Sequence, residues 1–239
     1  MLKFVLPRTH FEQINTWCLI CSALMMLYFI PVNGAIDHAL SLPWVNASGQ
    51  YTLKENHVLI EYGHQLLKNM VIAIALIHLG IVIASFIQPR LRTLRKIALT
   101  VLIMMLSSVA IIGVFKANSS HACPWDMVQL HQHVVAWDRT LLKQGACFPG
   151  GHASAGFALI ALYFAYRDRF IQLSKWFLVI ALVMGCIMSA VQMVRGAHFL
   201  SHNLWALWWS WAIDFYCYKW FMHTPLNLRI FSRFLPKAV

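Results

Sequence analysis

Six apolar runs, each close to the length of a bilayer-spanning helix, set the strongest limit on how this chain can fold. A transmembrane helix needs about 20 consecutive apolar residues. The runs are Thr16–Val32, Met70–Ile87, Ile97–Phe115, Ala153–Tyr166, Trp176–Val194 and Asn203–Met222. None alternates apolar and polar residues, as the strands of an outer-membrane barrel do. The sequence therefore predicts an all-α fold, a six-helix transmembrane bundle forming one integral membrane domain over residues 1–239.

The composition agrees with a membrane location. Hydrophobic residues make up 60% of the chain and charged residues only 11%, whereas soluble domains average roughly 45–50% and about 25%. Such a chain has too little polar surface for a soluble globule. It is also too apolar to be intrinsically disordered.

The net charge of +11 is explained by its placement along the chain. If both termini are cytoplasmic, 13 of the 19 basic residues fall on the inner side and 6 on the outer side, where five of the eight acids also lie. This is the positive-inside pattern of membrane proteins. We therefore expect no nucleic-acid partner, and we interpret the first run as a retained anchor rather than a cleaved signal peptide.

The polar residues that stand out lie at the outer ends of the last four runs. Lys116 ends the third run, His152 precedes the fourth, and Arg195, His198 and His202 lie between the fifth and the sixth. The segment Pro149-Gly150-Gly151, directly before His152, lets the backbone approach a ligand closely at a helix start, where free N–H groups favour a phosphate. Two cations and two imidazoles at one depth predict an anion site with acid–base or nucleophilic chemistry at the outer (periplasmic) face.

These segments resemble the three-part signature of the type 2 phosphatidic acid phosphatase superfamily, which includes bacterial lipid phosphatases and vanadium haloperoxidases. Lys116 and Pro124 keep the spacing of the first part, with Cys123 where arginine is usual. The second part, Pro-Ser-Gly-His, reads Pro149-Gly150-Gly151-His152 here. In the third part His198 is kept, Val191-Gln192 replaces Ser-Arg, and His202 takes the aspartate position.

The resemblance implies a phosphohistidine mechanism. His198 would attack phosphorus, while His152 would protonate the leaving oxygen and later activate water. The phosphoryl oxygens would be held by Lys116, the Gly150 and Gly151 backbone, and Arg195 or Gln192 in place of the missing arginines. His202 can accept a hydrogen bond but cannot stabilise an imidazolium as a carboxylate does. Asp126 and Asp138 in the outer loop are alternative carboxylates.

Cys123 and Cys147 both fall in the outer loop, on the oxidising side of a bacterial inner membrane. We predict a disulfide between them that ties the Lys116 segment to the turn before His152. The remaining cysteines, Cys18, Cys21, Cys186 and Cys217, lie within the apolar runs and are interpreted as small packing residues.

Other polar residues are assigned structural roles. His131 and His133 form a His-x-His pair, but two ligands without a third make a weak metal site, so a solvated loop is the preferred interpretation. His78 and Asp214 lie within the runs and are expected to form hydrogen bonds between helices.

The sequence thus predicts a membrane lipid phosphatase of the bacterial inner membrane, acting on a lipid phosphomonoester or pyrophosphate without metal or cofactor. Its expected partners are the lipid phosphate substrate and membrane lipids. Two alternatives stay open: a phosphotransferase that passes the phosphoryl group to a second lipid, and a non-catalytic lipid-phosphate binder or transporter. The sequence leaves the identity of the lipid and the oligomeric state open.

Overall fold

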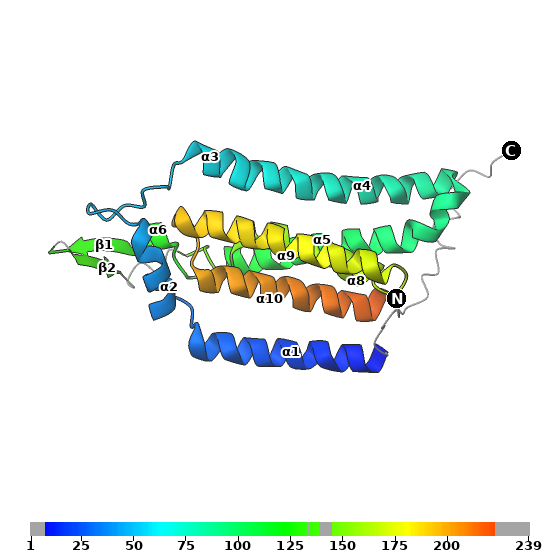
Figure 1. The fold of residues 1–239 in the computed structure, drawn as a ribbon, viewed down its shortest axis with the longest axis horizontal. Coiled ribbons are helices and arrows are strands. Elements are labelled where there is room, and N and C mark those ends of the chain that lie inside the picture. The colour runs from blue at the N-terminus through cyan, green and yellow to red at the C-terminus, as the bar shows by residue number, and fades with distance from the viewer. Residues whose placement is uncertain (1–7, 133, 139–144, 223–239) are drawn as a thin grey trace.

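Long helices that run side by side make up most of the molecule (Figure 1). The computed structural model describes residues 8–132, 134–138 and 145–222. The long helices are α1 (Arg8–Phe29), α4 (Leu67–Ile87), α5 (Arg92–Ala117), α9 (Ile171–Val194) and α10 (Leu200–Cys217), together with the consecutive pair α7 (Gly151–Phe157) and α8 (Ile160–Tyr166). Each apolar run of the sequence therefore falls on a helix or, in the fourth run, on a pair of helices.

Three helical segments of the described chain are long and apolar enough to cross a membrane. They are His57–Ile87, Pro89–Ala117 and Ile171–Val194, and Gly151–Tyr166 is a shorter apolar helix. The first joins α3 (His57–Ile60), the π-helical η2 (Glu61–Leu66) and α4, and the second joins the short helix η3 (Pro89–Leu91) to α5. The outer helices α1 and α4 expose large apolar side chains such as Trp17, Leu76 and Ile83, as expected of an integral membrane protein.

The pair α7–α8 forms the centre of the bundle. Its consecutive residues 156–162 are all buried, and it packs against α9, α5 and α10. A Cβ added to Gly156 would lie 2.8 Å from the Cα of Gly185 in α9, so the two helices approach through glycines. Between α7 and α8 the chain tightens, with the Leu159 N–H donating to the Gly156 carbonyl at 3.2 Å. The single helix expected for the fourth run is therefore two helices joined by a tight turn.

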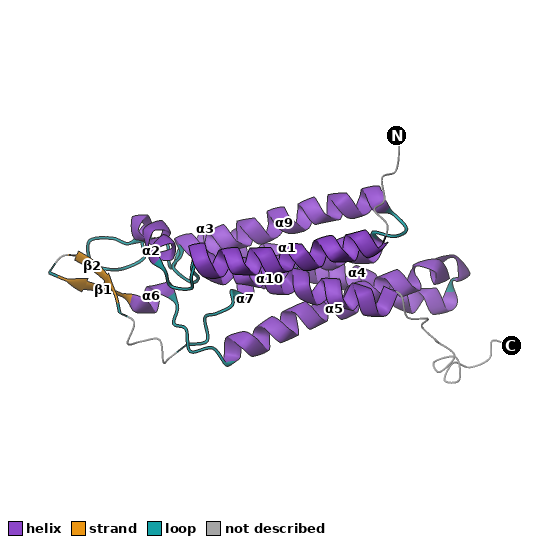
Figure 2. Cartoon of the chain, turned by 90° about the horizontal axis from the view of Figure 1, so that it is seen from below, coloured by secondary structure: helices purple, strands orange, loops and turns teal. Residues whose placement is uncertain are grey.

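The longer connecting segments gather at one end of the bundle (Figures 1 and 2). They comprise α2 (Ala35–Ser41), the 3₁₀ turn η1 (Leu42–Trp44), α6 (Pro124–Met127) and a hairpin of β1 (Val128–His131) and β2 (Val134–Trp137). The strands are antiparallel, with Val128 opposite Trp137. This hairpin is a departure from the all-α prediction. Each strand has only four residues, which is too short for its alternating pattern to be recognised in the sequence. A π-helical turn, η5 (Tyr218–Met222), continues α10.

The two ionisable residues within the apolar runs form hydrogen bonds between helices. Nε2 of His78 in α4 lies 3.2 Å from the hydroxyl oxygen of Tyr166 in α8. Asp214 of α10 accepts a hydrogen bond from Ser108 of α5, with an oxygen–oxygen distance of 2.9 Å. Both contacts agree with the structural role predicted for these residues. In contrast, His133 of the His-x-His pair lies outside the described residues.

Candidate functional site

His198 lies in the short connection between α9 and α10, and a glycine shapes that connection. Gly196 has a φ of 78°, a left-handed conformation that favours glycine. The Ala197 N–H donates to the Gln192 carbonyl at 2.9 Å, and the Gly196 N–H donates to the Met193 carbonyl at 2.9 Å. This pair of bonds is the Schellman ending of an α-helix. The turn directs His198 back toward the bundle, where its side chain is 1% exposed.

His198 and His152 contact each other directly. Nε2 of His198 lies 3.3 Å from Nδ1 of His152, which stands in the first turn of α7. On its other side, Nδ1 of His198 lies 3.3 Å from the sulfur of Cys147. Burial, followed by charge repulsion with His202, His152 and Lys116 when these are protonated, holds the pKa of His198 well below its ordinary value. The imidazole is therefore neutral near pH 7, the form in which it can act as a nucleophile.

The predicted disulfide is present and fixes the backbone beside His198. Cys123 and Cys147 are joined across a sequence separation of 24 residues. Cys147 is fully buried, and its backbone also forms a hydrogen bond to the His198 side chain. Cys147, His198 and His202 place three potential ligand atoms within 4.8 Å of one another. Because the Cys147 sulfur is used in the disulfide, it supplies no thiolate, so this group does not fit a metal site.

Lys116 reaches the start of α7 from the last turn of α5. A Cβ added to Gly151 would lie 3.1 Å from Cδ and 3.4 Å from Nζ of Lys116. The ammonium group therefore lies beside the first N–H groups of α7, which have no acceptor within their own helix. Gly150 does not have the role expected of it, because its N–H donates to the His202 carbonyl at 2.9 Å. Only the N–H groups that follow Gly150 remain to receive a phosphoryl oxygen.

Arg195 and Gln192 lie together, as their spacing of one helical turn predicts. Nη1 of Arg195 donates to Oε1 of Gln192 at 3.3 Å, and Nε donates to the Lys54 carbonyl at 3.0 Å. Gln192 is 1% exposed, and its Nε2 has no hydrogen-bond partner among the described residues. A buried amide donor without an acceptor is costly. Gln192 is thus able to donate to an anion that enters beside His198.

His202 does not contact His198 in the way the family's aspartate position implies. The two rings are 5.9 Å apart between centroids, and Nε2 of His202 lies 3.3 Å from Oδ1 of Asn33. The amide nitrogen of Asn33 in turn lies 3.3 Å from Nδ1 of His121. The other two candidate carboxylates are engaged near the hairpin, where Asp126 accepts from Trp125 and Asp138 accepts from Gln129, each at 3.0 Å.

The carboxylate that does reach this region is Asp37 of α2, which the sequence analysis did not single out. Asp37 is 1% exposed and accepts hydrogen bonds from the N–H and hydroxyl of Ser201, at 2.9 and 2.5 Å. It also accepts from the Asn33 N–H at 2.9 Å. Ser201 lies in the first turn of α10, where a negative charge is favourable. Asp37 therefore fixes the start of the helix that follows His198.

His64 is a second residue that sequence reasoning missed. It lies in the π-helical η2, and its ring centroid is 4.5 Å from that of His152. A Cβ added to Gly63 would lie 2.7 Å from Val191, so glycine allows η2 to pack closely on α9. Two features of the sequence could have drawn attention to these residues. His64 is a histidine in a loop without other motifs, and Asp37 is one of only eight acidic residues in the chain.

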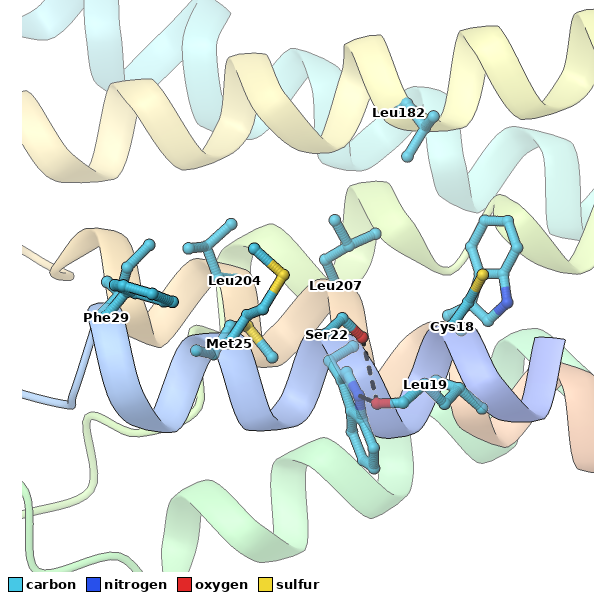
Figure 3. Close-up of a pocket in the computed structure, with 12 residues that line it drawn as sticks. Cys18, Leu19, Ser22, Met25, Phe29, Leu182, Leu204 and Leu207 are labelled. Atoms are coloured by element: carbon cyan, nitrogen blue, oxygen red, sulfur yellow. Dashed lines mark hydrogen bonds between the residues drawn. The ribbon is translucent and has the colours of Figure 1, made fainter. Parts of the chain in front are cut away.

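An apolar groove runs along the bundle (Figure 3). It has a volume of about 480 Å³ and lies between α1, α9 and α10. Its walls include Met25 and Phe29 of α1, Leu182 of α9, and Leu204 and Leu207 of α10. Phe29 ends α1 four residues before Asn33, whose side chain contacts His202, so one end of the groove lies toward the histidines. The groove itself contributes no acid, base or cation to the chemistry.

Comparisons with known proteins agree with this arrangement. No curated protein sequence matches the chain. A solved structure, the crystal structure of the first transmembrane PAP2 type phosphatidylglycerolphosphate phosphatase from Bacillus subtilis, has a similar fold, with a TM-score of 0.53 and 16% sequence identity. The match covers 91% of this chain and 98% of that one. The family model of the PAP2 superfamily matches residues 97–224, which is more than half of the chain and includes Lys116, His152 and His198. The chain belongs to the PAP2 superfamily.

Proposed function

We propose that this protein is a lipid phosphatase that removes a terminal phosphoryl group through a phosphohistidine on His198. The observation that carries the proposal is the contact of His198 Nε2 with His152 Nδ1 at 3.3 Å, with Lys116 at the adjacent helix start. A neutral imidazole beside a second imidazole and a cation has the parts of a nucleophile, a general acid and an anion ligand. Membership of the PAP2 superfamily supports the same chemistry.

In the first step, Nε2 of His198 attacks phosphorus and the bond from phosphorus to the leaving oxygen breaks. Burial, followed by charge repulsion with His64 and Lys116, lowers the pKa of His152 to about 4, so His152 takes a proton from the bound phosphomonoester and gives it to the leaving oxygen. The lipid product then leaves. In the second step, neutral His152 takes a proton from water, whose oxygen attacks the phosphohistidine and releases inorganic phosphate. Nε2 of His198 lies 3.3 Å from Nδ1 of His152, so phosphate binding must separate the two rings.

Three groups are positioned to hold the oxygens of the transferred phosphoryl group. They are Lys116, the N–H groups at the start of α7, and the free amide nitrogen of Gln192, whose Oε1 accepts a hydrogen bond from Arg195. The backbone of Cys147 forms a hydrogen bond to the imidazole of His198, a role that the family signature gives to a carboxylate. A backbone acceptor fixes the tautomer of the imidazole but stabilises its cationic form less than a carboxylate does.

We further propose that α1, α4, α5, α7–α8, α9 and α10 are six membrane spans of a bacterial inner-membrane protein, with both termini cytoplasmic. The site then lies at the outer face, at the end of the bundle where α2 and the hairpin gather (Figure 1). The disulfide supports this orientation because the outer side is oxidising. The inner connections carry the basic residues Arg90, Arg92, Arg167 and Arg169.

Phosphate release from purified lipid phosphates in detergent tests the proposal. We expect release by the wild type, and its loss by at least about 1,000-fold in His198→Ala and His152→Ala. His131→Ala is the matched control, because His131 is an exposed histidine of the hairpin. Unchanged release in His198→Ala would show that the nucleophile is wrong. Transfer of labelled phosphate to an acceptor lipid would indicate the phosphotransferase, and binding without turnover would indicate the non-catalytic binder.

A further inference from the structure

The site's geometry also defines where the leaving group must lie. Displacement at phosphorus places the attacking and leaving atoms on opposite sides. If His198 attacks and His152 protonates the leaving oxygen, as proposed above, the leaving group extends past His152, away from His198. The chemical character of the residues beyond His152 therefore reports the character of the leaving group.

The His64 ring contacts that of His152, at 77° with 4.5 Å between the centroids. The ring contacts of His198 in the described chain are with His152 and His202 and not with His64, so we place His64 on the side of His152 away from His198. Lys68 follows His64 by four residues, and residues i and i+4 of a helix share a face. Both side chains are half-buried, so they are reachable by a ligand. Packing of Gly63 against Val191 holds this face of η2 against the end of α9.

Arg195 completes the group from the end of α9. Two hydrogen bonds, to the Lys54 carbonyl and to Gln192, hold its guanidinium. The charges of Lys68 and Arg195 act on both His64 and His152. Glu55 is the acid whose charge acts on Arg195, but within the described part of the chain neither Lys68 nor Arg195 forms an ion pair. The region beyond His152 thus carries a positive excess.

We propose that His64, Lys68 and Arg195 form a second anion site, which binds a phosphoryl group carried by the leaving group. The substrate class is then a lipid with two phosphoryl groups, in which the terminal one is transferred to His198 and the inner one stays with the lipid product. Two kinds of lipid share this chemistry: a lipid diphosphate, and a phosphomonoester with an inner phosphodiester such as phosphatidylglycerol phosphate. Phosphatidic acid lacks it, because its leaving group is neutral. This inference rests on the proposed phosphatase function.

The second anion site leaves the proton transfer from His152 unchanged and adds charge compensation for the leaving group. The inner phosphoryl group brings its own negative charge, which Lys68 and Arg195 offset. The bond from phosphorus to the leaving oxygen still breaks with one proton delivered by His152, so the proton balance is that of the proposed mechanism. The cations hold the leaving group at the distance from His152 that proton transfer requires.

The test is the ratio of kcat/KM values for three substrates in one detergent: farnesyl diphosphate, phosphatidylglycerol phosphate and phosphatidic acid. We expect the wild type to favour one or both of the first two over phosphatidic acid. In Lys68→Gln and His64→Gln that preference should fall roughly 10- to 100-fold, since charge-assisted contacts to phosphate are lost. His57→Gln is the matched control, an exposed histidine at the start of the same helical segment.

The outcomes separate the two proposals. A preference that falls for only one of the two-phosphate lipids identifies that lipid chemistry as the source. If Lys68→Gln and His64→Gln lower the turnover of all three substrates by the same factor, or of none, the second anion site is wrong while the phosphatase proposal stands. If no substrate releases phosphate in the wild type, the proposed function fails and the second anion site fails with it. Gel filtration of each variant confirms that it is folded.

Discussion

Replacing Asp37 by alanine removes the carboxylate that ties α2 to the first turn of α10. Three hydrogen bonds to a side chain that is 1% exposed would be lost, two from Ser201 and one from the Asn33 N–H. Burial raises the pKa of Asp37, while the hydrogen bonds from Ser201 and Asn33 oppose this rise. Gly34 makes the smallest contribution, and its N–H also donates to the Pro31 carbonyl, so it is not left unpaired. At about 1 kcal/mol or more for each donor left unpaired, the loss amounts to about 3 kcal/mol.

We expect Asp37→Ala to lower the Tm in detergent by roughly 5–10 °C. We also expect kcat to fall by roughly 10- to 100-fold, because His198 precedes Ser201 by three residues and small displacements of a catalytic group are costly. Asp37→Asn replaces one acceptor oxygen by an NH2 donor, which must face the N–H of either Ser201 or Asn33, so its effect should approach that of Asp37→Ala. The measurements are a thermal unfolding curve and an assay of phosphate release.

The matched control for Asp37 is Asp126→Ala, which changes an exposed aspartate at the same end of the bundle. It should leave both the Tm and the phosphate release close to the wild-type values. If Asp37→Ala has the Tm and kcat of the wild type, the carboxylate does not hold α10 and the reasoning is refuted. Loss of kcat with an unchanged Tm would contradict the energetic part alone.

Three further predictions follow from the site. Gly151→Ala places a Cβ 3.1 Å from Cδ of Lys116, so we expect kcat/KM to fall roughly tenfold. The control Gly113→Ala lies in the same helix as Lys116 with open space around its Cβ, and it should keep full activity. Equal kcat/KM values for both variants would contradict the placement of Lys116. Because the pKa of His198 lies well below the ordinary 6.5, the unfolded chain binds more protons there below that pH. The Tm should therefore decline as the pH falls below about 6.5, and His198→Asn should flatten this decline; a Tm that rises on acidification would reverse the assigned sign. Cys123→Ser removes a disulfide that spans 24 residues and should lower the unfolding free energy by about 3 kcal/mol. The control Cys186→Ser changes an exposed cysteine and should lower it by less than 1 kcal/mol. Denaturant titration of both variants measures the difference.

The parts of this molecule that depend on local sequence could be predicted. An apolar run is a local property, so each run falls on observed helices, and Lys116, His152 and His198 come together because they stand at the ends of those helices. The role expected of Gly150 was wrong for a tertiary reason, since its N–H is used by a carbonyl of α10. A pattern in the sequence carries no information about such a partner.

The contributions of Asp37 and His64 could not be predicted for a related reason. Asp37 bonds to a residue 164 positions away, and His64 meets His152 across an interval of 88 residues. Neither residue belongs to a motif, and the family model begins at residue 97. Each lies in a connecting segment whose position is set by packing, such as that of Gly63 on Val191.

The Asp37–Ser201 contact also has a consequence for the order in which the protein is made. α10 is not among the helices that qualify as membrane spans by length and composition, and it carries the polar residues His202 and Asp214. Their partners, Asn33 and Ser108, like Asp37 itself, belong to segments synthesised earlier. The last long helix therefore enters a protein that already holds the groups its polar side chains need. Since the same contacts fix the turn that carries His198, we expect the surroundings of His198 to be complete only once α10 has packed against the earlier segments.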